Sequence, residues 1–201
     1  EQIKLSLNFP KKFLWGASIS THQVEGGNHN QWTTWELETA QEKVAQASYN
    51  YEHLPLWNEI KKEALKPENY VSGKSADHFN LYKHDFDIAQ RLNFSVLRSG
   101  IEWSRIEPKE GEFDPAAIAH YKQYFAEMKK RGIEPVITLW HWTFPDWFAG
   151  KGGFAKRRNI KHFTQYVEYV TEQLGMHFNY VITMNEPTVY AAMSYHERRW
   201  P

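Results

Sequence analysis

The tripeptide Asn185-Glu186-Pro187 places an amide and a carboxylic acid directly after an uncharged run of apolar and β-branched residues, 180–184. Such a run is typical of a buried β-strand. Pro187 has no N–H to donate to a sheet, so the strand is expected to end at Glu186. In enzymes built on parallel strands the reacting groups gather at this end, which makes Glu186 a candidate reacting carboxylate. An ordinary strand-to-loop junction that contains Glu explains the tripeptide equally well.

Polar side chains also stand at or just past the ends of three further predicted strands. They are His22, Gln23, Glu25, Arg98, Glu102, His141 and Trp142. Singly, Gln23 could cap a turn, His141 could be a satisfied core histidine, and Arg98 could pair with a carboxylate. Together, hydrogen-bonding groups at four parallel strand ends indicate one shared site. The sequence has no convincing metal-ligand spacing and no Gly-rich phosphate loop, so these residues favour a ligand rich in hydroxyl groups.

The elements that must position these residues alternate between strands and helices. Strands are predicted at 13–19, 94–98, 135–140 and 180–186, with ends near residues 19, 99, 140 and 185. Helices are predicted at 75–92, 114–131 and 160–174, the second of them starting at an Asp114-Pro115 cap. This alternation predicts an α/β fold of parallel βαβ units within a single domain, residues 1–201.

The segment between the first strand and the first predicted helix, 20–74, shows no sustained helical period. A short helical turn is expected from Glu59 to Leu65. A connection of this length is either functional or disordered, and its many aromatic residues favour an ordered, functional segment.

Composition excludes several classes of function. Lys plus Arg and Asp plus Glu both total 24, so a neutral chain has no electrostatic reason to bind nucleic acid or an anionic membrane. The absence of cysteine excludes disulfides, thiolate metal sites and a cysteine nucleophile. No apolar run is long enough for a membrane span, and the first residues do not resemble a signal peptide. We expect a soluble, cytoplasmic protein without a cofactor.

Five motifs give the chain a specific resemblance. They are Phe13-Leu14-Trp15-Gly16-Ala17-Ser18, Gln23-Val24-Glu25-Gly26-Gly27, Glu102-Trp103-Ser104-Arg105-Ile106-Glu107-Pro108, Thr138-Leu139-Trp140-His141-Trp142 and Thr183-Met184-Asn185-Glu186-Pro187. In this order and spacing the chain resembles glycoside hydrolase family 1, the β-glucosidase and β-galactosidase type. The resemblance implies about four βα units, the N-terminal half of a (β/α)8 TIM barrel, and a retaining β-glycosidase mechanism.

The resemblance also implies roles for individual residues. Glu186 would be the catalytic acid/base, and Asn185 would contact the 2-hydroxyl of the sugar. Gln23 and His141 would contact other hydroxyls of the nonreducing sugar, and Trp142 is also expected to bind substrate. Arg98 resembles the arginine that lies beside the nucleophile. The run from Gly100 to Trp103 departs from the commoner Ser-Ile-Ser-Trp form of the family, so Glu102 receives no role.

The family's nucleophile lies in a Glu-Asn-Gly motif of the second half, and this motif does not occur in the sequence. We therefore expect the isolated chain to be inactive on β-linked glycosides and to need a missing C-terminal half-barrel or a second chain. Two alternatives are a catalytically silent half-barrel that binds sugar and a structural half that self-associates. The residues that would separate glucosides from galactosides lie partly in the absent half.

Overall fold

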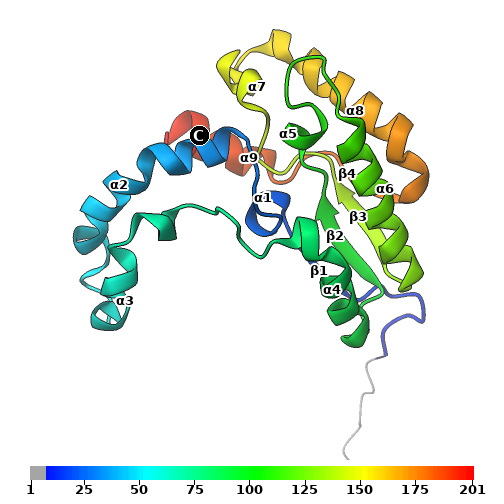
Figure 1. Ribbon diagram of the computed structural model, residues 1–201, viewed down its shortest axis with the longest axis horizontal. Coiled ribbons are helices and arrows are strands. Elements are labelled where there is room, and N and C mark those ends of the chain that lie inside the picture. The colour runs from blue at the N-terminus through cyan, green and yellow to red at the C-terminus, as the bar shows by residue number, and fades with distance from the viewer. Residues whose placement is uncertain (1–7) are drawn as a thin grey trace, which may run out of the picture.

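A computed structural model describes residues 8–201, which form a four-stranded parallel sheet in the order β1-β2-β3-β4 (Figure 1). The strands are β1 (Gly16–Ser18), β2 (Val96–Gly100), β3 (Glu134–Thr138) and β4 (Tyr180–Ile182). Neighbours in the sheet are also neighbours in the sequence and pair in parallel, as expected for successive βαβ units. The predicted α/β class is therefore confirmed.

Three strands end within two residues of their predicted ends. β4 ends earlier, at Ile182, where its pairing with Thr138 of β3 stops. Glu186 therefore does not belong to the strand. The prediction that the strand is buried is also wrong, because β4 is an edge strand and Val181 is 45% exposed.

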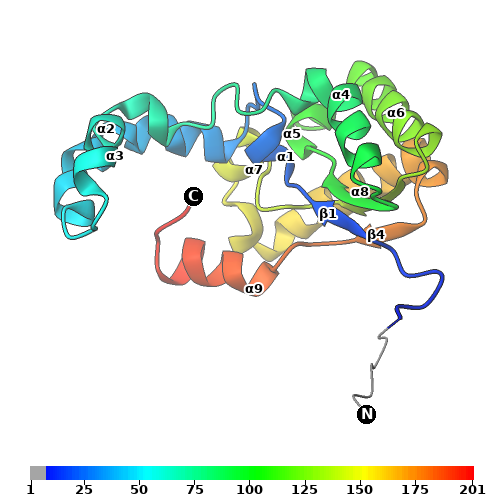
Figure 2. The same cartoon turned by 90° about the horizontal axis from the view of Figure 1, so that it is seen from below.

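Three long helices cover one side of the sheet (Figure 2). They are α4 (His78–Arg91), α6 (Pro115–Lys130) and α8 (Ile160–Leu174), close to their predicted bounds. The cap at the start of α6 is confirmed, since the Asp114 carboxylate accepts a hydrogen bond of 2.7 Å from the backbone N–H of Ala116. Fully buried side chains on these helices, among them Phe86, Phe125 and Val170, belong to the same core as Ile137 of β3. Each such side chain stabilises the fold by about 1.5–3 kcal/mol.

The segment 20–74 is largely helical, so the prediction that it lacks sustained helix is wrong. It contains α1 (Thr21–Val24), the 21-residue α2 (Gln31–Tyr51), α3 (Trp57–Ala64) and the short 3-10 helix η1 (Pro67–Tyr70). The buried positions of α2 are Gln31, Glu36, Ala40 and Ala47, so no stripe of large apolar residues marks the helix in the sequence. In Figure 1, α2 and α3 extend away from the sheet as an arm.

Short helices follow the carboxyl ends of the strands. α5 (Trp103–Ile106) comes after β2, α7 (Asp146–Gly150) after β3 and α9 (Pro187–Tyr190) after β4. The remaining 3-10 helices are η2 (Gly153–Ala155), η3 (Arg157–Asn159) and η4 (Gly175–His177), and a π-helix, η5 (Ala191–His196), follows α9. Within residues 8–201, no helix combines the length and the apolar character needed to cross a membrane.

Candidate functional site

A cavity of about 200 Å³ lies at the carboxyl ends of the strands. Its lining comes from the segments after β1 and β3, from α2 and from the loop before α4. The lining residues are Ser20, His22, Gln23, Trp32, Glu36, Ser72, His141, Trp142 and Thr143. Three of the predicted sugar-binding residues, Gln23, His141 and Trp142, thus meet at one cavity.

Gln23 lies on α1 and keeps part of its amide available. Its side-chain oxygen accepts a hydrogen bond of 2.7 Å from the Ser20 hydroxyl, and the Ser75 hydroxyl donates to its backbone oxygen. The suggestion that Gln23 caps a turn is not met within residues 8–201, because its side chain bonds to a hydroxyl and to no backbone N–H. Its Nε2 group has no protein partner within residues 8–201 and remains a donor for a ligand.

His141 is half-buried against the cavity and is not a satisfied core histidine. Its Nδ1 atom is buried and has no hydrogen-bond partner among residues 8–201. Burial, the largest cause, and the positive charge of Arg98 together lower the pKa of His141 to about 4, against the opposing charge of Glu102. The imidazole is therefore neutral near pH 7, and Nε2 is the ring nitrogen left to contact a hydroxyl group of a ligand.

Arg98 connects β2 to the residues that follow β4. Its Nε donates to the hydroxyl of Thr138 at 2.9 Å, and its Nη2 donates to the side-chain oxygen of Asn185. Asn185 is buried, and this contact fixes which end of its amide is occupied. Within residues 8–201 Arg98 forms no ion pair with a carboxylate. The suggestion that Arg98 serves only to pair with a carboxylate is therefore not supported among these residues.

Trp142 and Glu186 both adopt left-handed backbone conformations, with φ of 72° and 40°. Non-glycine residues rarely do so, and such strain concentrates at functional sites. The indole Nε1 of Trp142 donates to the backbone oxygen of Asn185 at 3.0 Å, and its ring stacks on Trp32. Glu186 is exposed, does not line the cavity, and has no side-chain hydrogen bond within residues 8–201. The predicted acid/base, Glu186, thus directly follows Asn185 in the chain, but its side chain forms no hydrogen bond with the residues that line the cavity.

Comparison with sequence models of known families shows which family this chain belongs to. The sequence model of glycosyl hydrolase family 1 matches residues 5–201. The chain belongs to glycosyl hydrolase family 1. The resemblance inferred from the five motifs is therefore confirmed.

Solved structures of glycosidases resemble this family 1 chain over nearly its whole length. A β-glycosidase from Pyrococcus horikoshii is 36% identical with a TM-score of 0.78, and the match covers 96% of this chain and 39% of that one. A β-glucosidase designated 1317 is 34% identical, TM-score 0.72, with coverage of 92% and 40%. A β-glucosidase from Thermotoga maritima, solved with castanospermine, is 27% identical, TM-score 0.76, with coverage of 92% and 38%. The chain thus spans about two fifths of the length of these structures, and the expected partial (β/α)8 barrel is confirmed.

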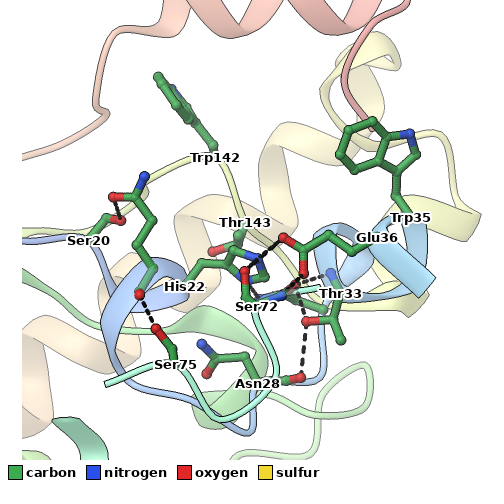
Figure 3. A network of polar contacts seen from close by, with 12 residues as sticks. Ser20, His22, Asn28, Thr33, Trp35, Glu36, Ser72, Ser75, Trp142 and Thr143 are labelled. Carbon is green, nitrogen blue, oxygen red and sulfur yellow. Dashed lines mark hydrogen bonds and ion pairs between the residues drawn. The ribbon is translucent and has the colours of Figure 1, made fainter. Parts of the chain in front are cut away.

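One polar cluster of the family 1 chain joins His22, which the sequence predicts at the shared site, to Glu36 and Ser72, which it does not predict there (Figure 3). The Nε2 atom of His22 lies 3.1 Å from Oε1 of Glu36, and Glu36 also accepts hydrogen bonds from the backbone N–H and the hydroxyl of Ser72, both at 2.8 Å. Burial by itself raises the pKa of Glu36, but these hydrogen bonds outweigh it and the pKa is lowered. Trp32 and Glu36, four residues apart, share one face of α2, a signal that is visible once the helix is recognised.

A larger cavity, of about 460 Å³, lies elsewhere and contains none of the predicted site residues. It is lined in part by Arg105, Asp114 and His120. The Arg105 guanidinium is already used by Glu25, at 2.9 Å, and by the backbone oxygen of Gly26. We assign the functional site to the smaller cavity because it collects the polar groups from the strand ends. Among residues 8–201 no cluster of His, Asp and Glu could hold a metal ion.

Proposed function

We propose that this chain binds the nonreducing sugar of a β-glycoside and supplies the acid/base of a retaining β-glycosidase. The observation that carries the proposal is the convergence of Gln23, His141 and Trp142 on one cavity at the strand ends. A cavity of about 200 Å³ is smaller than the roughly 300–1,000 Å³ of pockets for drug-sized ligands, which suits a single sugar ring.

The polar contacts support a specific orientation of that sugar. Arg98 occupies the side-chain oxygen of Asn185, which leaves the Nδ2 donor of Asn185 for the 2-hydroxyl. The neutral imidazole of His141 and the free amide donor of Gln23 serve the other hydroxyls. Trp142 offers an apolar face for the sugar ring.

The proposed reaction needs two carboxyl groups about 5–5.5 Å apart. Glu186 would protonate the glycosidic oxygen as the bond to the anomeric carbon breaks, and would later accept a proton from the attacking water. The attacking carboxylate forms the covalent glycosyl intermediate in between. We propose that this nucleophile comes from outside residues 1–201, since the sequence contains no Glu-Asn-Gly, and that Arg98 lies beside it. The chain by itself would then bind sugar without hydrolysing it.

Castanospermine provides a direct test, because the Thermotoga maritima relative was solved with it. Saturation-transfer NMR with the 201-residue chain is expected to show binding of castanospermine. The variant His141→Ala should lose this signal, whereas His84→Ala, which removes an exposed histidine of α4 outside the cavity, should keep it. No binding by the wild-type chain, or equal binding by both variants, would contradict the proposed site.

Hydrolysis of a nitrophenyl β-glucoside separates the catalytic part of the proposal from sugar binding alone. The 201-residue chain is expected to show no enzymatic turnover, and turnover should appear when a chain carrying a second catalytic carboxylate is supplied. Robust turnover by the purified chain, abolished by Glu186→Gln, would disprove the placement of the nucleophile outside it. Binding that never gains activity with any second half would instead favour a silent sugar-binding protein.

A further inference from the structure

Glu102 lies two residues after the end of β2 and, at 1% exposed, is among the most deeply buried carboxyl groups of residues 8–201. Within residues 8–201 no cation forms an ion pair with it. A buried carboxylate without a cation is stable only when hydrogen bonds satisfy its oxygens. The donors around Glu102 therefore decide what it does.

Four neutral side chains donate to the Glu102 carboxylate. Thr21 and Thr143 donate to Oε2 at 2.7 and 2.9 Å, and Ser104 and Asn30 donate to Oε1 at 3.0 and 3.3 Å. These donors match the roughly four lone-pair positions of an ionised carboxylate. An amide in this place could not accept from all of them, because it has one oxygen and carries two donors.

The donors belong to the segments that carry the cavity residues. Thr21 precedes His22 and Gln23 on α1, and Thr143 directly follows Trp142. Asn30 is the N-cap of α2, which carries Trp32 and Glu36. One carboxylate thus joins three segments at the cavity, each of them distant from Glu102 in the sequence.

Asn30 extends the network toward the cavity wall. Its Nδ2 group also lies 3.3 Å from Nδ1 of His22, and its oxygen accepts the backbone N–H of Thr33 at 2.9 Å. His22 is held on its other side by Glu36 (Figure 3). The residue before Gln23 is therefore fixed by both ends of its imidazole ring, and Glu102 anchors the group that fixes it.

We propose that Glu102 is a positioning residue, which sets the spacing between Gln23 and His141 by holding Thr21 and Thr143 on one oxygen. Glu102 does not line the cavity and is not assigned a contact with the sugar. This role rests on the proposed sugar-binding function. It also assigns a role to Glu102, which lies where the sequence departs from the commoner Ser-Ile-Ser-Trp form of the family.

The test compares Glu102→Gln with Glu107→Gln in the 201-residue chain. Glu107 is a matched control because it is also buried, but it accepts from Trp103 and from the backbone of Gly111, away from the cavity. Glu102→Gln is expected to weaken castanospermine binding about tenfold, the size of effect that losing hydrogen bonds to a charged group gives. Glu107→Gln should leave the affinity within about twofold.

A double-variant cycle separates positioning from general destabilisation. If Glu102 acts through Thr143, then Thr143→Val weakens binding on its own but adds no further loss to Glu102→Gln. Losses that multiply would overturn the proposal. If Glu102→Gln fails to fold, Thr21→Val and Thr143→Val each remove one hydrogen bond to Glu102 while the carboxylate stays in place. Unchanged affinity for castanospermine in both variants would overturn the proposal.

Amide hydrogen exchange provides a readout that does not depend on the ligand. Exchange in segments 21–24 and 141–143 should become faster in Glu102→Gln and stay unchanged in Glu107→Gln. If the wild-type chain does not bind castanospermine, the proposed function fails, and this exchange comparison still decides the positioning role. Unchanged exchange in both segments would overturn that role whatever the ligand does.

Discussion

At the scale of single residues, the environment of His141 determines the charge that this imidazole brings to the cavity. Burial and the neighbouring Arg98 lower its pKa to about 4. NMR titration of the imidazole should therefore show a midpoint near pH 4, and Arg98→Met should raise it. A midpoint near the ordinary value of 6.5, unaffected by Arg98→Met, would contradict the burial of this ring.

The same shift makes stability depend on pH. Because the folded-state pKa of His141 lies below 6.5, the unfolded chain takes up the proton first as the pH falls, so stability decreases from pH 6.5 toward pH 4. His120, whose pKa is also lowered to about 4 by burial, acts in the same direction. Glu25 acts in the opposite direction, because burial outweighs the charge of Arg105 and raises its pKa to about 7. The contribution of Glu25 to the stability of the fold is therefore lost as the pH rises from 4.5 to 7. Urea unfolding at pH 7 and pH 5 should show a smaller acid-induced loss for His141→Gln than for wild type.

Glu186 is the residue on which the proposed catalysis depends. In any assembled form that hydrolyses β-glycosides, Glu186→Ala should slow substrates with poor leaving groups far more than activated aryl glycosides, which need little protonation. Azide should restore turnover and give a β-glycosyl azide. Glu197→Ala, which removes another exposed carboxylate from the segment after α9, serves as the control. Equal losses on both substrate types without an azide product would remove Glu186 from this role.

The sequence predicted three residues that the structure brings together at one cavity. Gln23, His141 and Trp142 were recognisable because each follows a strand whose end could be located from apolar residues. Glu36 and Ser72 were not recognised, because they reach the cavity from elements that the sequence pattern does not reveal. Glu102 was noted at a strand end, but three of its four partners, Thr21, Asn30 and Thr143, are distant in the sequence, and no local pattern predicts these contacts.

At the scale of elements, a helix was predicted from the sequence when it buries large apolar side chains and missed when it buries polar or small ones. α6 was predicted because a cap and a stripe of large apolar residues mark it, whereas α2 buries polar groups and alanines and was missed. Tertiary hydrogen bonds through Glu36 and Asn30 hold α2 at its N-terminal end. Such a helix has no amphipathic signature to detect.

The turn after α1 offers a matched test of close packing between elements. Gly26 and Gly27 both have positive φ, but a Cβ atom at Gly26 would lie 2.0 Å from the backbone oxygen of Lys74, while one at Gly27 would meet open space. Both alanine variants carry conformational strain of about 1–2 kcal/mol. Gly26→Ala adds a backbone clash, commonly about 1–3 kcal/mol more, and displaces a turn that Arg105 holds. Urea unfolding measures the free energy of unfolding of both variants. Equal losses of stability in Gly26→Ala and Gly27→Ala would show that the turn is not packed as described.

At the scale of the whole molecule, β1 and β4 are open edges of a parallel sheet. Large apolar side chains lie exposed there, with Trp15 51% and Tyr180 50% exposed. Covering such a side chain contributes about 1.5–3 kcal/mol, so several of them together are comparable to the net stability of a domain. Unpaired edges of this kind favour association with another strand or chain.

We therefore expect the 201-residue chain to form dimers or larger oligomers unless a complementary half-barrel covers these edges. Val181→Lys should weaken this association, because a charge on an edge strand opposes pairing. Leu81→Lys is the matched control, since Leu81 is 48% exposed, much as Val181 is at 45%, but belongs to helix α4 and not to an edge strand. Sedimentation velocity over a dilution series measures the outcome. A compact, cooperatively unfolding wild-type monomer at submicromolar concentration would refute the idea that these edges need a partner, and equal effects of the two lysine variants would show that β4 is not the contact.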